Sequence, residues 1–179
     1  MVMKPRLRKL ALTAHLVASM GWLGAVVVFL ALAVIGLTSQ DAQTMRGAYL
    51  VMQPAAWWVL VPLAVASLLT GIVQALGTTW GLFRHYWVLF KLLINVVATV
   101  VLLMYMRTFG IMARTASDPA TSPSSIRALG ASPSQHAALA LMLLLVATLL
   151  AVYKPKGVTR YGQRKQRAEQ AQRRAVSVR

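Results

Sequence analysis

His15 and Lys91 stand out in this 179-residue chain as ionisable residues that lie inside otherwise apolar stretches. An ionisable side chain at the centre of a membrane-spanning helix costs about 2.5–3.5 kcal/mol on insertion scales, and it is a functional-site hypothesis by default. An imidazole can ligate a metal or carry a proton, and an amine can bind an anion or lose its proton when it is buried. Binding or proton chemistry is therefore expected at these two positions.

The two residues lie at equal depth. His15 comes five residues after Leu10, where the first apolar stretch begins, and Lys91 comes six residues after His85, where the third begins. At about 1.5 Å per helical residue, both lie roughly 7–9 Å below the same membrane boundary. The first and third helices can therefore present them to each other.

Lys91 has no predicted carboxylate partner. The chain's three acids lie outside the apolar stretches, at Asp41, Asp118 and Glu169. The amine is left to reach the headgroups, to bond to a group such as Asn95, to lose its proton or to contact a bound ligand. An anionic group or a metal on a ligand would satisfy it.

Further polar residues follow at helical spacing. Asn95 and Thr99 come four and eight residues after Lys91. Ser19 and Trp22 share the face of the histidine in the first helix. The second apolar stretch adds Ser67, Thr70 and Gln74. Because lipid offers no hydrogen bonds, these stripes are expected to point into the bundle.

The elements that position these residues are apolar helices. The chain is 58% hydrophobic, its mean hydropathy is +0.64, and 12% of its residues are charged, against roughly a quarter in a soluble domain. Runs of about 20 apolar residues predict spanning helices, here at about 10–37, 52–76, 85–106 and 135–153. The predicted fold class is an all-α four-helix transmembrane bundle over residues 1–156, with a basic tail over 157–179 that is frayed or forms a surface-lying helix. The stretch 108–134 reads as a loop.

The positions of the basic residues predict the orientation. The formal net charge is +16, and its clusters flank the first and last apolar runs, at 4–9 and 154–179. This pattern indicates contact with anionic lipid headgroups and argues against nucleic acid as a partner. By the positive-inside rule both termini are cytoplasmic, in a multi-pass protein of the bacterial plasma membrane.

Other residues have simpler interpretations. Arg84 and His85 lie at the membrane surface, where an interfacial role is the default, and they complete the set of candidate cofactor contacts. His136 begins the fourth helix on the outer side, too far from His15 to share a ligand. The tryptophans fit interfacial belts, at Trp57, Trp58, Trp80 and Trp87. The chain has no cysteine, which excludes disulfides and thiol chemistry.

Three segments resemble a known superfamily. HLVASMGWLGAVVVF (His15–Phe29) resembles the first helix of HemJ-type protoporphyrinogen oxidases and CopD-type copper-resistance proteins, in which a histidine precedes a Trp and a Gly. RHYWVLFKLLINVV (Arg84–Val97) resembles their third helix, and LAVYKP (Leu150–Pro155) resembles the closing Lys-Pro of HemJ. The whole chain is similar to actinobacterial relatives described only as predicted membrane proteins.

The resemblance implies haem b between the first and third helices. In HemJ-type proteins the matching histidine and lysine are associated with haem, which carries over to His15 and Lys91 as candidate metal ligands. The axial ligand would be a neutral imidazole, and the amine would ligate iron or contact a propionate. The candidate cofactor-binding residues are His15, Lys91, Asn95, Trp22, Ser19, Arg84 and His85. SPSQH (132–136) replaces the Asn-Glu-Pro-like element of HemJ and carries no acid, which leaves oxidoreductase activity open.

Three functions follow from these observations. The first is haem binding with a role in electron transfer or porphyrin handling, for which a quinone or another membrane protein would accept electrons. The second is CopD-like copper handling, suggested by nine methionines, among them Met20, Met104 and Met106 at ordinary core spacings; thioethers suit Cu(I). The third is a non-catalytic scaffold, possible also as a homo-oligomer, whose basic tail binds lipid or a partner.

Overall fold

The computed structural model describes residues 3–78 and 80–177 and confirms the predicted all-α fold class. Apart from one isolated bridge between His85 and Val158, the described residues contain no β-structure. The helices are α1 (Pro5–Thr38), α2 (Ala42–Ala55), the π-helical η1 (Ala56–Leu60), α3 (Val61–Leu76), α4 (Tyr86–Ser117), α5 (Pro123–Leu129), α6 (Ala131–Tyr153) and α7 (Arg160–Ser177).

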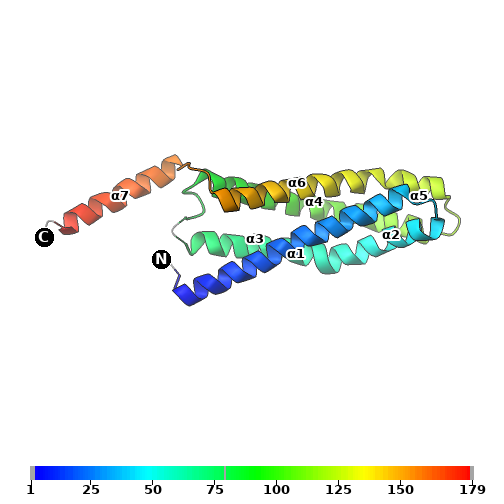
Figure 1. Cartoon of the computed structure of the whole chain (residues 1–179), viewed down its shortest axis with the longest axis horizontal. Coiled ribbons are helices and arrows are strands. Elements are labelled where there is room, and N and C mark those ends of the chain that lie inside the picture. The colour runs from blue at the N-terminus through cyan, green and yellow to red at the C-terminus, as the bar shows by residue number, and fades with distance from the viewer. Residues whose placement is uncertain (1–2, 79, 178–179) are drawn as a thin grey trace.

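Four helical rods form the bundle shown in Figure 1. They are α1, the continuous α2–η1–α3, α4, and α5 with α6, and each is long and apolar enough to cross a membrane. The large apolar side chains exposed along these rods, such as Leu16, Val28 and Leu93, indicate a lipid-facing surface. The protein is therefore an integral membrane protein.

The order of the rods around the bundle places α1 and α4 on a diagonal. α1 packs against α3 and α6, and α4 packs against the same two helices, whereas α1 and α4 make no backbone approach to each other in the described part of the chain. Side chains that project from α1 and α4 toward the bundle axis must therefore meet across its centre.

Both ends of the chain lie at one end of the bundle, which we call the basic end because the cations of 4–9 and of α7 gather there (Figure 1). The other, the far end, holds the α1–α2 turn and α5. At the basic end, α7 continues outward beyond the bundle. The Thr159 hydroxyl donates to the carbonyl oxygen of Phe83 at 2.6 Å, and Arg84 pairs with Glu169 at 3.0 Å. The tail is thus helical over Arg160–Ser177, and the predicted division at residue 156 falls in its link to α6.

The helices extend beyond the predicted spans at the far end. The second rod begins at Ala42 instead of 52, and α4 continues to Ser117 instead of 106. The predicted loop over 108–134 is wrong for most of its length, because the end of α4, the whole of α5 and the start of α6 are helical there. Hydropathy detects the apolar part of a helix, and the helices continue past it because they pack against one another.

Two polar side chains stabilise these extensions. Asp41 caps α2 by accepting hydrogen bonds from the backbone N–H groups of Gln43 and Thr44. Hydrogen bonds from the Thr44 side chain and from these two N–H groups hold the pKa of Asp41 below its ordinary value. The Arg46 guanidinium donates to carbonyl oxygens around the end of α4, those of Ala116, Asp118 and Thr121.

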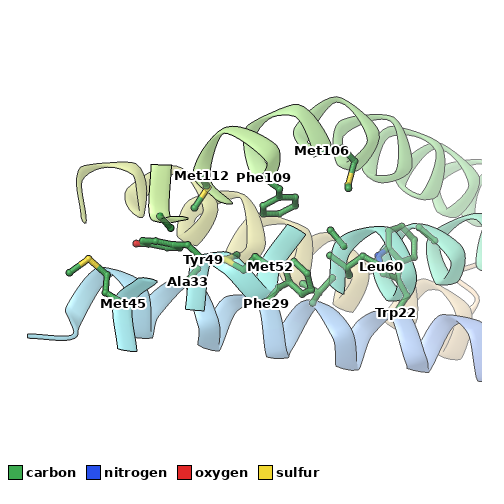
Figure 2. Packing of buried hydrophobic residues seen from close by; sticks show 14 of the residues in the cluster. Trp22, Phe29, Ala33, Met45, Tyr49, Met52, Leu60, Met106, Phe109 and Met112 are labelled. Carbon is green, nitrogen blue, oxygen red and sulfur yellow. The ribbon is translucent and has the colours of Figure 1, made fainter. Parts of the chain in front are cut away.

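The half of the bundle toward the far end has a solid core, which we call the packed half. Its buried cluster includes Phe29, Tyr49, Met52 and Phe109, and Figure 2 shows these side chains between α1, α2 and α4. Phe29 and Phe109 meet edge to face with ring centroids 5.6 Å apart. A Cβ added at Gly36 would lie 2.5 Å from the Tyr49 ring, so the glycine is what allows α2 to approach α1.

Candidate functional site

His15 is a buried histidine on α1, with 4% of its surface exposed. Its Nδ1 lies 3.1 Å from the Thr70 hydroxyl oxygen on α3. That hydroxyl donates its own proton to the Ala66 carbonyl oxygen one turn earlier, so we assign Nδ1–H as donor and the Thr70 oxygen as acceptor. The tautomer that results leaves the lone pair of the imidazole on Nε2.

Lys91 projects from α4 to this lone pair. Its Nζ lies 3.0 Å from His15 Nε2. Because α1 and α4 are diagonal, the two side chains meet across the centre of the bundle, as their equal depth predicted. With the tautomer assigned above, the amine donates and Nε2 accepts, so we assign a neutral imidazole. A neutral histidine with its second nitrogen fixed by a hydrogen bond is the form in which histidine binds metals.

A chain of hydrogen bonds surrounds the pair. The Ser19 hydroxyl lies 2.9 Å from that of Ser67, and the Ser67 hydroxyl donates to Asn95 Oδ1 at 3.4 Å. The Asn95 amide donates in turn to the Lys91 carbonyl oxygen at 3.1 Å, and Thr99 bonds back to the Asn95 carbonyl oxygen. The predicted polar stripes therefore do point inward, and they hold the Lys91 segment against α3.

A cavity of about 500 Å³ lies beside this network, between α1, α3, α4 and α6. Such a volume falls in the range of about 300–1,000 Å³ that is usual for small-molecule sites. His15 and Lys91 line it together with the indole of Trp22 and apolar residues such as Leu92 and Leu144. The basic-end half of the bundle, which we call the hollow half, thus combines a polar cluster with apolar walls.

The structure brings most of the predicted cofactor contacts to one place. His15, Lys91, Asn95, Trp22 and Ser19 all line the cavity. Trp22 also belongs to the buried core cluster and so joins the two halves.

Arg84 and His85 are not among the residues that line the cavity. Arg84 is engaged with Glu169 of α7. His85 precedes α4, its Nδ1 lies 2.9 Å from the Trp80 carbonyl oxygen, and its ring packs against the Trp80 indole. Both residues organise the turn before α4 and its junction with the tail.

Several cavity residues had no predicted role in the site. Arg8 and Lys154 line the cavity although they belong to basic clusters that read as topology signals, and Trp80 lines it although it reads as an interfacial anchor. Gly71 faces His15: a Cβ added there would lie 3.1 Å from the ring carbon Cε1. The one available signal was the position of Gly71 directly after Thr70, within the polar stripe.

The donor set is small for a bare metal ion. Within the described ranges, no three residues among histidines, cysteines and acids come together as a metal site. Of the methionines considered for copper, Met20 lines the cavity, Met106 is buried in the core, and Met104 is 73% exposed on the outside of α4. One imidazole and one amine suit a metal that brings most of its own ligands.

His136 lies near the start of α6, away from the cavity. Its ring is tilted against that of Tyr105 with centroids 4.6 Å apart, and its Nδ1 lies 2.8 Å from the Ser132 carbonyl oxygen. It does not line the cavity, so it provides a reference histidine within the same bundle.

Comparison with protein-family models, with curated proteins and with solved structures finds no match for this chain. The resemblance to HemJ-type and CopD-type proteins therefore stays a prediction from the sequence, and the function must be argued from the site.

Proposed function

We propose that this membrane protein binds haem b in the cavity of the hollow half, with His15 as an axial ligand. The observation that carries the proposal is the setting of the imidazole: it is buried, its Nδ1 lies 3.1 Å from the Thr70 hydroxyl oxygen, and His15 lines a cavity of about 500 Å³. Axial histidines are held in this way in haem proteins generally.

The residues fit the group in three respects. Haem brings four nitrogen ligands of its own, so one or two protein ligands suffice where a bare ion would need more. The apolar walls suit a macrocycle, and His15, Lys91 and Asn95 add polar groups to the same lining. Lys91 must leave Nε2 for iron to bind there, and its long flexible side chain allows this.

The bound haem would supply one-electron chemistry, consistent with electron transfer or porphyrin handling. The residues of this chain would keep the imidazole neutral and oriented, offer an amine at the second position and exclude water. A quinone or another membrane protein is the partner that electron transfer would require. By the positive-inside rule the basic end is cytoplasmic, which would place the site in the inner half of a bacterial plasma membrane.

The test is the visible spectrum of the detergent-purified protein, first oxidised and then reduced with dithionite. We expect a Soret band and sharpened bands on reduction. His15→Ala is expected to lose most of the pigment, whereas the matched control His136→Ala is expected to retain it, because His136 does not line the cavity. Colourless wild-type protein from cells supplied with haem, or equal pigment in the two variants, contradicts the proposal.

A further inference from the structure

Within the described ranges, the lining of the cavity carries cations from three parts of the chain and no carboxylate. Arg8 comes from α1, Lys91 from α4 and Lys154 from the residue that follows α6. Among the described residues, no Asp or Glu lines the same cavity. Its charge is therefore one-sided, which favours an anionic ligand.

The acids of the chain are committed elsewhere. Asp41 and Asp118 lie at the far end, where they accept hydrogen bonds in the α1–α2 turn and after α4. Glu169 accepts two hydrogen bonds from Arg84 at 3.0 Å on the tail. In the part of the chain that the structure describes, none of them is available to the cavity cations.

Lys154 carries a second, independent signal in its backbone. It adopts the left-handed conformation, with φ 45° and ψ 60°, and among the described residues it is the one non-glycine with positive φ. This conformation costs about 1–2 kcal/mol for a residue with a Cβ, and such outliers cluster at functional sites. Here it ends α6 and brings the ammonium over the Trp80 ring, 5.5 Å from its centroid.

The cavity is thus graded along its length. Toward the packed half the cavity is lined by Trp22 and Leu144 of the core cluster, at mid-depth by His15 and Lys91, and toward the basic end by Trp80 and Trp87 with the cations Arg8 and Lys154. A ligand that matches this gradient has an apolar body and an anionic edge. Its body would lie in the cavity and its edge at the basic end.

We propose that Arg8 and Lys154 form an anion clamp that holds the carboxylates of a planar amphipathic ligand and so fixes which edge of the ligand faces the basic end. The clamp deepens the proposed function, because the propionates of a porphyrin have this chemistry, yet it needs no iron. The phosphate of an anionic lipid headgroup offers the same charge, so the test must separate the two sources.

The probes are metal-free protoporphyrin IX and its dimethyl ester, titrated into the full-length protein in non-ionic detergent and followed by quenching of tryptophan fluorescence. Because each charge-assisted contact contributes about tenfold in affinity, we expect the diacid to bind wild type at least about tenfold more tightly than the ester. A preference near one in wild-type protein overturns the clamp without any variant.

The variant is Arg8→Gln with Lys154→Gln, and it is expected to bring the diacid and ester affinities close together. Its matched control is Arg6→Gln with Lys9→Gln, which removes equal charge from the same basic end at exposed positions that do not line the cavity. The control is expected to keep the preference of wild type. Equal loss in both double variants would mean that general surface charge, not a clamp, attracts the diacid.

Phosphatidylglycerol added to the micelles separates the two anion sources. A diacid preference that persists supports a carboxylate clamp, and a preference that collapses to one assigns the clamp to lipid phosphate and overturns the proposal. The porphyrin arms also separate the clamp from haem ligation. A preference for the diacid without a haem spectrum supports the clamp and contradicts haem ligation. A haem spectrum that depends on His15, without a preference for the diacid, supports haem ligation and contradicts the clamp. Wild-type protein that binds neither porphyrin overturns the clamp, and the haem spectrum decides haem ligation separately.

Discussion

The two halves of this bundle are built from the same helices, but one half is filled with side chains and the other contains a cavity. In the packed half, aromatic and methionine side chains such as Phe29, Tyr49 and Met52 fill the space between the rods. In the hollow half the rods border a partly open cavity, and its lining includes polar side chains such as His15, Lys91 and Asn95. The boundary falls near Trp22, which belongs to both.

This difference in packing indicates that the packed half contributes most to the stability of the bundle. Protein interiors are normally close-packed, with few voids larger than a water molecule. A cavity of about 500 Å³ therefore gives up packing energy that the same helices do gain in the other half. The hollow half keeps its shape through hydrogen bonds instead, since His15, Ser19 and Ser67 each find a polar partner there. We interpret the packed half as the scaffold that holds the hollow half open.

The largest effect is expected from Phe29→Ala in the packed half. In water-soluble cores this change costs about 3–5 kcal/mol, but lipid tails also solvate an apolar side chain, so about 1–3 kcal/mol of packing is expected to be lost here. The measurement is the thermal midpoint in detergent. Haem content per folded molecule is expected to stay at the wild-type level, because Phe29 does not line the cavity.

The matched control is Val28→Ala at the preceding position of α1. Val28 is exposed to lipid, so its truncation is expected to leave the midpoint nearly unchanged. If Phe29→Ala were no more destabilising than Val28→Ala, the packed half would not be the stabilising part of the bundle.

The fold could be predicted because lipid imposes a simple rule: each apolar run of sufficient length must be a helix. The extensions of the helices at the far end could not be predicted in this way. Residues 42–51 and 107–117 include Arg46, Arg107 and Arg114, which end a hydropathy window but not a helix. What continues these helices is contact between α2, α4 and α5, and contacts between distant segments leave no local signal.

The pairing of His15 with Lys91 could be predicted, whereas the place of Arg8 and Lys154 in the cavity lining could not. Equal depth sufficed to pair His15 with Lys91, because depth along a helix follows from residue count alone. Arg8 and Lys154 read as topology signals, since a cation that lines a cavity and one that meets headgroups have the same sequence pattern. The distinction depends on helix rotation and on the left-handed turn at Lys154, which sequence spacing does not give.

The next effect in size is expected from Thr70→Val in the hollow half. It removes the acceptor for His15 Nδ1–H while keeping the shape of the side chain. Loss of such a partner typically costs about 10–100-fold in metal affinity, so a decrease of that order in haem affinity is expected, measured by haem titration of the apoprotein. Thr148→Val is the matched control, because Thr148 also lines the cavity but bonds to its own helix at Leu144. Equal effects in the two variants would contradict the assigned tautomer.

The smallest effect is expected from Gly71→Ala, which separates an effect on haem affinity from an effect on stability. The new methyl carbon would lie 3.1 Å from His15 Cε1, so the imidazole must shift by a few tenths of an ångström while it keeps its bond to Thr70. Haem affinity is therefore expected to fall by about threefold, less than for Thr70→Val. Stability is expected to rise slightly, because alanine is favoured over glycine in helices by up to about 1 kcal/mol.

Gly24→Ala gives the reference for that last comparison, since a methyl group there meets nothing within 4 Å. It shares the helix-propensity gain with Gly71→Ala but lacks the contact with the imidazole. Gly71→Ala is therefore expected to have a thermal midpoint no higher than that of Gly24→Ala and to bind haem more weakly. If both variants bound haem as wild type does, the His15 imidazole would not be held against α3. Haem binding would then depend on the shape of the cavity and not on the position of this ring.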